Sequence, residues 1–471
     1  LVIPIEKFYS SHLTFTFKHR SSNFDKDKSQ KITNFAYVRL MNLKDGTTLL
    51  DCDHDLVVYK CDAKEIKDNS YFKLPSLKSE LHLPAGTLSK SNALCVGKLT
   101  LSPKESFQIS SLLCSTKLTQ NVELLGLLKW KSQIDNLRVI LPQVTNVKGE
   151  EIVKFLQDIF DALFAILMES PDRYGKLVFD DLVFVINLLA DKKYSHFRPV
   201  LDTYIADLFS AAKAHDTLIT VLSGYVMVVT STESARLDVV KLDFLFKTMK
   251  AIEYIFKLIV RSRLLFERMS SEHNAEKFHD DLNRLFKVLV LMMGDQRSET
   301  LKVQGQALKN IPSIFGHALK VYDPVRLGEF ARDLITSIPA GRLNSQKLTC
   351  IHDIVKSELF ENEVSRGFML PMLTSELIPH LRNESELKVC VDIISDLLVT
   401  LNRADVGPTF EDINHIALEL LSPILKNVIR INRTESFAGK YFACFISLLR
   451  LMTLQHYDRF VVSFQDRDNF T

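Results

Sequence analysis

The residues whose types and spacing could do chemistry gather in one short basic cluster near the start of the chain. It consists of Lys18, His19, Arg20, Lys26, Lys28 and Lys31, and with Asp25 and Asp27 its local net charge is +3 when histidine is neutral. A basic loop of this kind can surround phosphate groups, and each cation near an anionic membrane surface contributes about 1 kcal/mol. An ordinary solvated loop explains the same composition, and charge alone favours that second interpretation.

Signatures of nucleotide binding and of nucleophilic catalysis are missing from the sequence. No GxGxxG occurs, and three Gly-Lys pairs lack the upstream glycine of a phosphate-binding loop: Gly97-Lys98, Gly175-Lys176 and Gly439-Lys440. Ser223-Gly224 does not lie in a GxSxG, and the SxxK from Ser210 to Lys213 lacks its companion motifs. We therefore predict no catalytic residue and no nucleotide cofactor.

Metal-ligand spacings are also missing. The 13 histidines include no HExxH, and Asp180 and Asp181 are adjacent on an expected helix, so their carboxylates should point in different directions. The seven cysteines form no CxxC and are predicted to be reduced, buried thiols: Cys52, Cys61, Cys95, Cys114, Cys350, Cys390 and Cys444. The sequence predicts neither a metal nor any other cofactor.

Composition narrows the class of protein further. The 471 residues carry 59 basic and 57 acidic side chains, so no global signal for nucleic-acid binding is present. Only 15 Gly and 14 Pro occur, which disfavours a linker-rich or mainly all-β chain. The longest apolar runs are shorter, or more broken by charge, than the roughly 20 residues that a membrane helix needs.

The first part of the chain has the alternating pattern of β-strands. Runs from His12 to His19, Asn34 to Met41, Asp55 to Cys61 and Ser106 to Thr119 are rich in β-branched and aromatic residues, with turn signals between them. These strands are too few to close two sheets comfortably. We expect part of an antiparallel β-sandwich, with the basic cluster in a loop between the first two strands.

After Gly149 the apolar period changes to 3.6, beginning with Ile152, Phe155, Leu156 and Ile159. Similar patterns predict further helices around 176–190, 197–213, 241–266, 277–293, 299–320, 325–336, 343–357, 368–381, 386–400, 410–430 and 437–455. Helix starts are expected at Asp323-Pro324 and, through a capping box with Asp412, at Thr409.

The expected domains are a partial sandwich at 1–136, a linker at 137–149 and a helical array at 150–471. Helix pairs recur about every 40 to 45 residues, which fits an armadillo or HEAT-like α-solenoid. Periodicity alone leaves an irregular multi-helix domain as the alternative.

Long blocks in collinear order resemble the dedicator of cytokinesis (DOCK) family, and most of all its Rac-activating subgroup. In the sandwich they are SHLTFTFKHRSS from Ser11, DGTTLLDCDHDLVVYKCDAKE from Asp45 and SFQISSLLCSTKLTQNVELLGLLKW from Ser106. In the helical part they include GEEIVKFLQDIFDALFAILME from Gly149, FKLIVRSRLLF from Phe256, QKLTCIHDIVKSELF from Gln346, LPMLTSEL from Leu370 and DVGPT from Asp405. The resemblance covers essentially the whole chain.

The resemblance implies a segment of a guanine nucleotide exchange factor for Rac-type small GTPases that works with an ELMO-family partner. In that family a C2-like sandwich binds phosphatidylinositol trisphosphate through basic loops, and a helical array connects it to a distal exchange domain. It also implies that this chain begins inside the sandwich and ends before the exchange domain, so no exchange residue is assigned here and the chain itself is expected to be non-catalytic.

The resemblance also changes the interpretation of the basic cluster. By position, Lys18 to Lys31 matches one of the family's lipid-facing loops, which favours phosphoinositide headgroup contact over the ordinary loop. Asp25 and Asp27 alternate with lysines rather than converge, so this contact should not need calcium. We expect a cytoplasmic protein that is recruited peripherally to the plasma membrane; a protein-interaction solenoid with no lipid role is the alternative.

Overall fold

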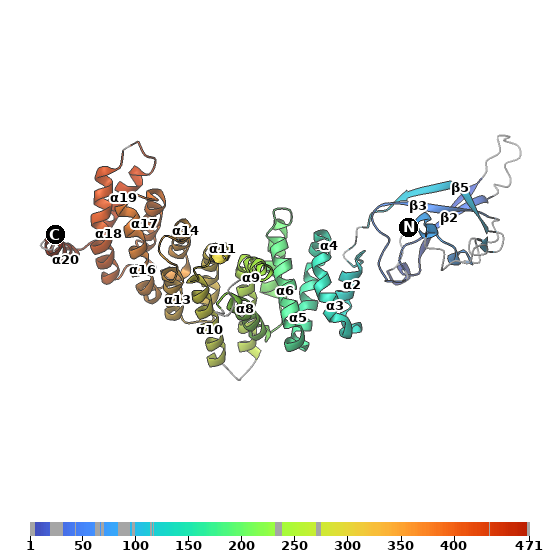
Figure 1. Cartoon of the computed structure of the whole chain (residues 1–471), viewed down its shortest axis with the longest axis horizontal. Coiled ribbons are helices and arrows are strands. Elements are labelled where there is room, and N and C mark those ends of the chain that lie inside the picture. Colours follow the sequence, from blue (N-terminus) through green and yellow to red (C-terminus); the bar gives the residue numbers. More distant parts are fainter. Residues whose placement is uncertain are drawn as a thin grey trace. The chain divides into compact units, whose positions relative to one another are not determined.

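The computed structural model describes residues 5–18, 32–42, 44–61, 66, 70–82, 95–96, 99–113, 115, 117–230, 238–269, 275–432 and 434–468. Its chain divides into two compact units, Leu1–Phe155 and Leu156–Thr471. The first holds the strands and the second is helical (Figure 1). His19, Arg20, Lys26, Lys28 and Lys31 of the basic cluster lie outside the described residues, as do Cys114 and the turn at 83–86.

The first unit is built on one antiparallel sheet with the strand order β1-β2-β3-β5-β4. Its strands are β1 (His12–Lys18), β2 (Ile32–Arg39), β3 (Asp53–Lys60), β4 (Cys95–Val96) and β5 (Leu99–Ser110), after a short helix α1 (Ile5–Phe8). Three predicted strands are thus confirmed. The fourth begins and ends earlier than predicted, because β5 uses 99–105 and the chain leaves the sheet after Ser110.

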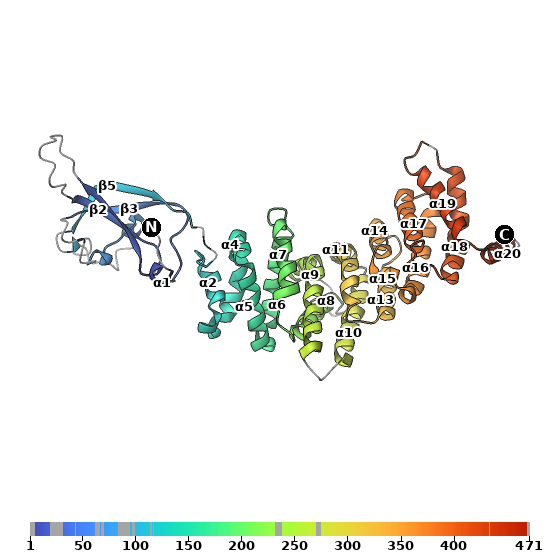
Figure 2. The ribbon, with the colours of Figure 1, turned by 180° about the vertical axis from the view of Figure 1, so that it is seen from behind.

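The sheet bends until its two sides face each other. Strands β2 and β3 pair only through Asn34–Lys60 and Phe35–Tyr59, after which Leu56 forms a bridge with Leu77 instead. The ring of Phe107 on β5 then lies 4.9 Å from Phe15 and 5.2 Å from Phe17, both on β1. Because β1 and β5 are not neighbours in the strand order, these contacts define an apolar layer inside the bend, as expected for part of a sandwich. Figures 1 and 2 show the strands of this unit from opposite sides.

A second apolar cluster covers the outer side of the bend. Its buried members are Phe35, Tyr37, Val57, Tyr59, Cys61, Tyr71, Leu74 and Leu99. The segment with the short 3-10 helices η3 (Ser70–Lys73) and η4 (Lys78–His82) supplies Tyr71 and Leu74 and is pinned by the Val57 N–H, which donates to the Ser76 carbonyl at 2.9 Å. Both faces of β2 and β3 are therefore buried, which explains their near-continuous apolar sequences.

Short helices complete the first unit, some within the segment 1–136 that was predicted as a partial sandwich and others within the predicted linker at 137–149. They are α2 (Val122–Leu128), η5 (Trp130–Ser132), η6 (Ile134–Asn136), α3 (Leu137–Gln143), η7 (Val144–Asn146) and α4 (Gly149–Lys154). Asn121 caps α2, because its side chain accepts from the Leu124 N–H at 2.7 Å. Helix α3 buries Leu137 and Leu141 but contains Pro142, and two apolar contacts in seven residues are too few to stand out as a period.

The second unit is a stack of helices in two layers. The first layer runs through α5 (Leu156–Glu169), α8 (Ala214–Thr230), α10 (Ala275–Met293), α13 (Pro324–Thr336), α16 (Glu363–Arg382), α18 (Phe410–Arg430) and α20 (Leu454–Asp468). The second layer runs through α6 (Pro171–Leu189), α9 (Val239–Met269), α11 (Leu301–Asn310), α14 (Asn344–Val355), α17 (Leu387–Leu401) and α19 (Ala438–Leu451). In Figure 1, α8, α10, α13 and α16 lie along the lower side of this unit, and α9, α11, α14, α17 and α19 along the upper side.

Shorter elements connect the layers: η8 (Ser195–Phe197), α7 (Arg198–Thr203), η9 (Tyr204–Leu208), η10 (Ser298–Thr300), η11 (Ile311–Ile314), α12 (Phe315–Ala318) and α15 (Glu358–Glu361). The single helices predicted at 197–213 and 299–320 are therefore interrupted. Pro312 explains the second interruption, because a proline has no N–H to continue the helical ladder. Helices α8 and α20 had not been predicted.

Hydrogen bonds between successive hairpins reveal a structural repeat that is not visible as a repeated amino-acid sequence. Tyr204 donates to Asp161, 43 residues away, and Asn427 donates to the Leu381 carbonyl, 46 residues away. His352 contacts Asp396 at 2.7 Å across 44 residues. Asn187 donates to the Lys247 carbonyl across 60 residues, so the spacing lengthens around the long helix α9. Each of these hairpins bonds to the next, which confirms the solenoid over the irregular alternative.

Two predicted helix starts are confirmed by their caps. The Asp323 carboxylate accepts from the Arg326 N–H at the start of α13. At α18, Thr409 Oγ1 accepts from the Asp412 N–H and the Asp412 carboxylate accepts from the Thr409 N–H, each at 3.0 Å. Among the described helices, none has the length and apolar character to cross a membrane.

Candidate anion-binding rim of the sheet

Lys18 is the member of the basic cluster that the structure places. It is the last residue of β1 and pairs with Ile32, the first residue of β2, after a register shift between Phe17 and Lys18. The 13 residues between this pair join two neighbouring strands at one end of the sheet. The segment that holds the other five candidates therefore starts and finishes at this rim.

A second cation at the same rim, Lys60, was not among the predicted site residues. It is the last residue of β3, is exposed, and pairs with Asn34 of β2 and Thr100 of β5. A lysine at the end of a strand is common, so the sequence alone does not mark Lys60 as a binding residue. The register of the strands places it near the connection that begins at Lys18. One carboxylate is also at this rim, because Glu105 accepts a hydrogen bond from the Asn34 side chain.

The opposite rim holds an arginine whose charge is already engaged. Arg39 donates through Nη2 to the Phe72 carbonyl at 2.8 Å, and its guanidinium lies 4.7 Å from the centre of the Phe72 ring. His12 Nε2 lies 2.6 Å from the Tyr71 hydroxyl, and burial, followed by the charge of Arg39, lowers the pKa of His12. Burial raises the pKa of Tyr37 to about 12. This rim is a packed support for the 70–74 segment rather than a receptor for anions.

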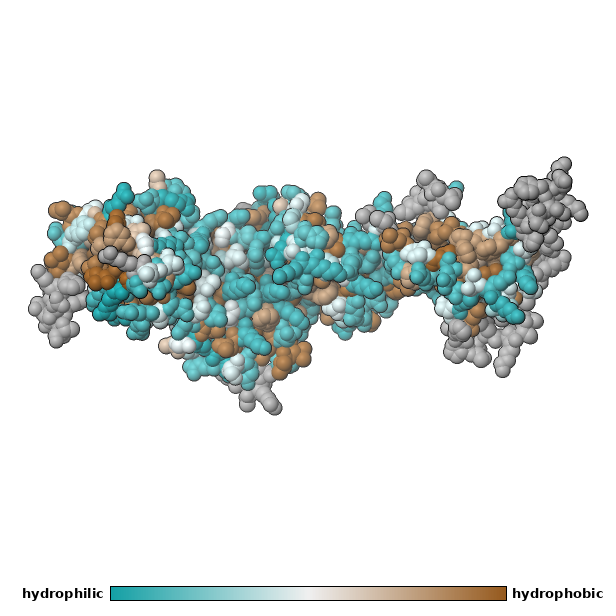
Figure 3. Space-filling view, turned by 90° about the horizontal axis from the view of Figure 1, so that it is seen from above, coloured by the Kyte–Doolittle hydropathy of each residue, from teal (hydrophilic) through white to brown (hydrophobic). Residues whose placement is uncertain are grey.

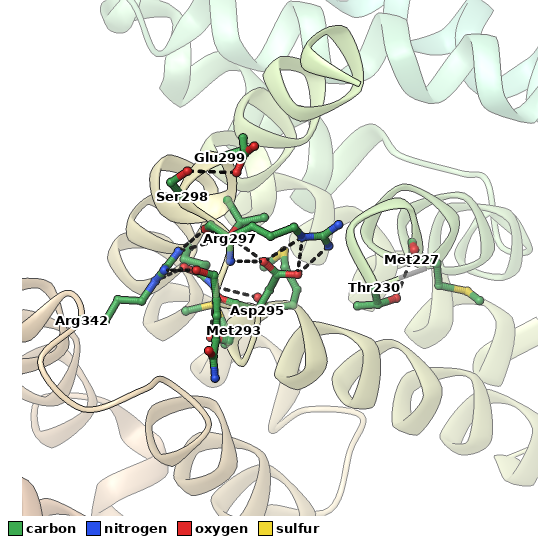
Figure 4. A network of polar contacts seen from close by, with 12 residues as sticks. Met227, Thr230, Met293, Asp295, Arg297, Ser298, Glu299 and Arg342 are labelled. Atoms are coloured by element: carbon green, nitrogen blue, oxygen red, sulfur yellow. Dashed lines mark hydrogen bonds and ion pairs between the residues drawn. The ribbon is translucent and has the colours of Figure 1, made fainter. Parts of the chain in front are cut away.

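Polar contacts in the helical unit fasten the turns between helices (Figure 4). Arg342, which precedes α14, donates to the carbonyls of Gln296 at 2.8 Å and Arg297 at 2.6 Å. Asp295 accepts from the Arg297 guanidinium, and the Thr300 hydroxyl donates to Asp295 at 3.1 Å. In Figure 4 the Arg297 guanidinium points toward the end of α8 at Met227 and Thr230, while Arg342 fastens the turn before α14 to the turn after α10.

A buried ion pair fastens a second set of turns. Arg366 on α16 is completely buried, and its Nε donates to Asp412 at 2.9 Å. Its other nitrogens donate to the carbonyls of Glu361 at 3.1 Å and Gly407 at 3.0 Å. Gly407 has a φ of +60°, a conformation that favours glycine. The DVGPT block therefore has two structural roles in this turn: Gly407 offers Arg366 a carbonyl, and Thr409 caps α18.

The adjacent carboxylates on α6 were predicted to point in different directions, and they do not form an acid–base pair. Asp180 accepts from the Tyr225 hydroxyl of α8, whereas Asp181 is buried and its Oδ2 has no hydrogen-bond partner. Burial, then the charge of Asp180, raises the pKa of Asp181 well above its usual range. Within the described residues no group of three or more His, Cys, Asp or Glu side chains could hold a metal ion.

Exposed apolar side chains occur along the described part of the helical unit, and eight of them lie on its last three helices. They are Leu425 and Ile429 on α18, Phe442 and Ile446 on α19, and Leu454, Tyr457, Val461 and Val462 on α20. Figure 3 shows hydrophobic colour at this end of the helical unit, whereas the middle of the same face is mostly hydrophilic.

Comparison with known proteins agrees with this architecture. A family model described as the C2 domain in Dock180 and Zizimin proteins matches residues 1–123, and one described as the dedicator of cytokinesis (DOCK) TPR region matches residues 133–471. Dedicator of cytokinesis protein 3 of Homo sapiens is 37% identical over 99% of this chain, and dedicator of cytokinesis protein 4 of Mus musculus is 36% identical over 99% of it.

The chain therefore belongs to the dedicator of cytokinesis family. It spans 24% of the length of each of these two relatives. The described hairpins repeat at the longer spacing of armadillo and HEAT units rather than at the roughly 34 residues of a tetratricopeptide repeat, although the family model carries the latter name.

Proposed function

We propose that this chain is the membrane-targeting and scaffolding segment of a guanine nucleotide exchange factor for Rac-type small GTPases. The sheet contacts phosphatidylinositol trisphosphate, or another anionic phosphoinositide, and brings the cytoplasmic parent protein to the plasma membrane. The helical array sets the distance and orientation of the exchange domain. The GTPase and an ELMO-family protein bind other parts of the parent, and this chain does no covalent chemistry.

The observation that carries the lipid part of the proposal is the pairing of Lys18 with Ile32. It brings both ends of a segment with a net charge of +3 to one rim, where Lys60 adds another cation. Phosphate groups of a headgroup are recognised by several cations at once, and each contributes about 1 kcal/mol near an anionic surface. At the opposite rim the guanidinium of Arg39 is committed to Phe72.

The observation that supports the scaffolding part is the regular bonding between hairpins. The Arg342 and Arg366 contacts fasten turns that lie one hairpin apart, so neighbouring hairpins are held in fixed relation. An array of this kind transmits position along its length because each repeat contacts its neighbours.

The lipid proposal is tested by vesicle cosedimentation of the full-length parent protein. Phosphatidylcholine vesicles with and without phosphatidylinositol trisphosphate are compared for the wild type and for a variant with Lys18→Glu, Arg20→Glu, Lys26→Glu and Lys28→Glu. Reversal of four charges should weaken binding to the phosphoinositide vesicles by at least about tenfold, since each lost cation costs about 1 kcal/mol.

A matched control reverses four exposed lysines of the helical unit: Lys192→Glu, Lys250→Glu, Lys302→Glu and Lys309→Glu. The two variants have the same net charge, so a loss confined to the first identifies the loop rather than overall charge. Equal binding of wild type and the loop variant would refute the lipid role of this loop.

The alternative, a protein-interaction solenoid, is favoured by one observation, the apolar surface on α18 to α20. Contiguous exposed apolar surface marks sites of protein contact. In the same assay this alternative predicts binding that ignores the phosphoinositide content of the vesicles.

A further inference from the structure

Two neighbouring second-layer segments of the helical unit are strongly basic, although the whole chain is nearly neutral. Helix α9 carries seven Lys and Arg side chains against three Asp and Glu, so its net charge is +4. Residues 301–320, which include α11, η11 and α12, carry three lysines and no acidic side chain. The first-layer helices α8 and α10 have net charges of −1 and 0. Positive charge is therefore concentrated in one part of the second layer.

Polar contacts show that the two basic segments lie side by side. Asn310, at the end of α11, donates to the Met249 carbonyl of α9 at 2.9 Å. Further along, His317 of α12 lies near Lys257 of α9, because burial and then the charges of Lys257 and Lys320 lower the pKa of His317. Position 310 is thus beside position 249, and position 317 is beside 257. Residues 301–320 run parallel to α9, and their cations form two adjacent rows.

Five cations in these rows have no acidic partner. Those on residues 301–320 are the exposed lysines Lys302, Lys309 and Lys320. On α9 they are Lys250, which is exposed, and Arg261, which is partly exposed. Among the ion pairs between described residues, none includes any of these five side chains. We call these five residues the basic face of the helical unit.

Arg261 also has an unsatisfied hydrogen-bond donor. Its Nε is buried and has no hydrogen-bond partner. Lys257, one turn earlier on α9, already binds Asp202 at 3.0 Å and Glu253 at 2.8 Å, so the nearest carboxylates are engaged there. A buried donor without an acceptor is costly, and a hydrogen bond between a guanidinium and a carboxylate is a strong one. A ligand that brings a carboxylate to Arg261 would therefore be stabilised.

The surface between the cations is polar. Exposed apolar side chains of the two segments lie only at their first or last residues, within the described part of the chain: Val239, Val240, Met269 and Leu301. Figure 3 views the helical unit from the side on which α9 and α11 lie in Figure 1, and the middle of this side is mostly hydrophilic. The basic face therefore offers charge, and few apolar side chains that could insert into a membrane.

The dimensions of the basic face fit one extended peptide. Neighbouring packed helices lie about 8–10 Å apart, so the two rows are separated by about that distance. Lys250 and Arg261 are 11 residues apart on one helix, which corresponds to about 16 Å. An extended chain covers this length with about five residues, and its side chains point alternately to opposite sides. Alternate acidic side chains of such a segment reach both rows of cations.

From this arrangement we infer that the basic face binds an acidic segment of a partner protein. The segment lies extended between α9 and residues 301–320. Its carboxylates contact Lys250 and Arg261 on one side and Lys309 and Lys320 on the other. Four of the five cations are exposed, so the affinity should fall as salt is added.

The test measures binding of two fluorescein-labelled peptides to the whole chain by fluorescence anisotropy. One peptide has six consecutive glutamates between flanking glycines, and in the other each glutamate is replaced by glutamine. The glutamate peptide should bind at least about tenfold more tightly at low salt, and this difference should shrink at high salt.

Charge reversal locates the peptide. The face variant combines changes at three exposed lysines: Lys250→Glu, Lys309→Glu and Lys320→Glu. It should bind the glutamate peptide at least about tenfold more weakly than the wild type. The control variant has the same net charge and reverses three exposed lysines on other helices: Lys287→Glu, Lys388→Glu and Lys426→Glu. It should bind within about twofold of the wild type, and circular dichroism checks the fold of both variants.

Arg261→Gln tests the unsatisfied donor separately. This change removes the charge while keeping a polar side chain, and it should weaken binding of the glutamate peptide about threefold or more. In the vesicle assay described above, the face variant should bind phosphoinositide vesicles as the wild type does, because the basic face is assigned to a protein segment.

Three results would each overturn the inference. They are equal binding of the glutamate and glutamine peptides by the wild type, equal affinities of the face and control variants for the glutamate peptide, and a face variant that loses vesicle binding but keeps peptide binding. The last result would assign these cations to a membrane. The peptide measurements do not depend on whether the sheet binds lipid.

Discussion

Arg366 and Asp412 show how a single buried pair can serve several elements at once. The guanidinium joins α16, the turn before it and the turn before α18, while the carboxylate also caps α18. Taking two charges out of water is expensive, so such a pair is tolerated only when every donor and acceptor is used. Removing one member leaves the other uncompensated.

Replacing Arg366 by Met should therefore be costly. We expect Arg366→Met to lower the free energy of unfolding by about 3–5 kcal/mol, because Asp412 and two carbonyls lose their donors in the interior. Urea denaturation followed by circular dichroism measures this. The matched change Arg403→Met, at a pair with Glu361 and Asp405 that is 41% exposed on the arginine side, should lower the free energy of unfolding much less. Equal losses in the two variants would contradict the assigned role of burial.

The unpartnered carboxylate of Asp181 should make stability depend on pH in a defined direction. Its pKa is raised in the folded chain, so the folded state holds the proton more tightly than the unfolded state does. That contribution is full below the ordinary pKa of an aspartate and is lost as the pH rises through the raised value. Asp181→Asn should therefore raise the melting temperature at pH 7 and change it little at pH 4.

Melting curves across this range, with exposed Asp172→Asn as the control, test the expectation. A gain of the same size at both pH values would mean that packing rather than ionisation is responsible.

The roles of individual residues were harder to predict from the sequence than the elements or the class of fold. The basic cluster stood out by its composition, and DVGPT by its resemblance, yet nothing in the neighbourhood of Arg366 marks it as buried. The same holds for Lys60 at the rim. These assignments depend on which strands and hairpins lie side by side, and a local pattern does not encode that.

At the level of elements, the capping box of α18 gives a direct test of a feature read from sequence. Thr409→Ala removes the side chain that accepts from the Asp412 N–H and should destabilise the chain by about 1 kcal/mol. The control is Thr349→Ala, an exposed position inside α14 whose hydroxyl bonds only its own helix. Urea denaturation should show little change for the control; a loss as large as that of Thr409→Ala would contradict the capping role.

Element prediction succeeded where the period was long and failed where it was short. Helices such as α5, α10 and α18 present wide apolar faces over several turns and were predicted near their true bounds. Helix α8 was missed because it is apolar on nearly all sides, being packed between α9, α10 and α6. The short α3 offers too few turns to display a period, so an ordered segment was predicted as a linker.

At the scale of the whole molecule, stability should be local in the helical unit. Hairpins contact only their neighbours in each layer, so stability approximates a sum of nearest-neighbour terms. Arg366→Met should therefore increase amide hydrogen exchange in α16, α17 and α18 while leaving α5, α6 and α8 within error of the wild type. Hydrogen exchange with mass spectrometry measures both sets in one experiment, and a uniform increase over all helices would contradict the nearest-neighbour description.

At this scale the class of fold could be predicted from the sequence. The apolar period of the first region differs from that of the second, and both composition and periodicity are averaged over many residues. The bend of the sheet could not be predicted, since it depends on β2 and β3 separating after two pairs and on the ring of Phe107 reaching β1.

The bonding of each hairpin to the next has a consequence for how such a protein can change over generations. Duplication or deletion of one complete hairpin would leave every remaining helix in its own layer and its partners in register. Loss of one helix alone would exchange the layers of all that follow and place apolar faces in water. Arrays of this kind should therefore lengthen and shorten in whole hairpins, and a family built on them can alter its reach without redesigning its interior.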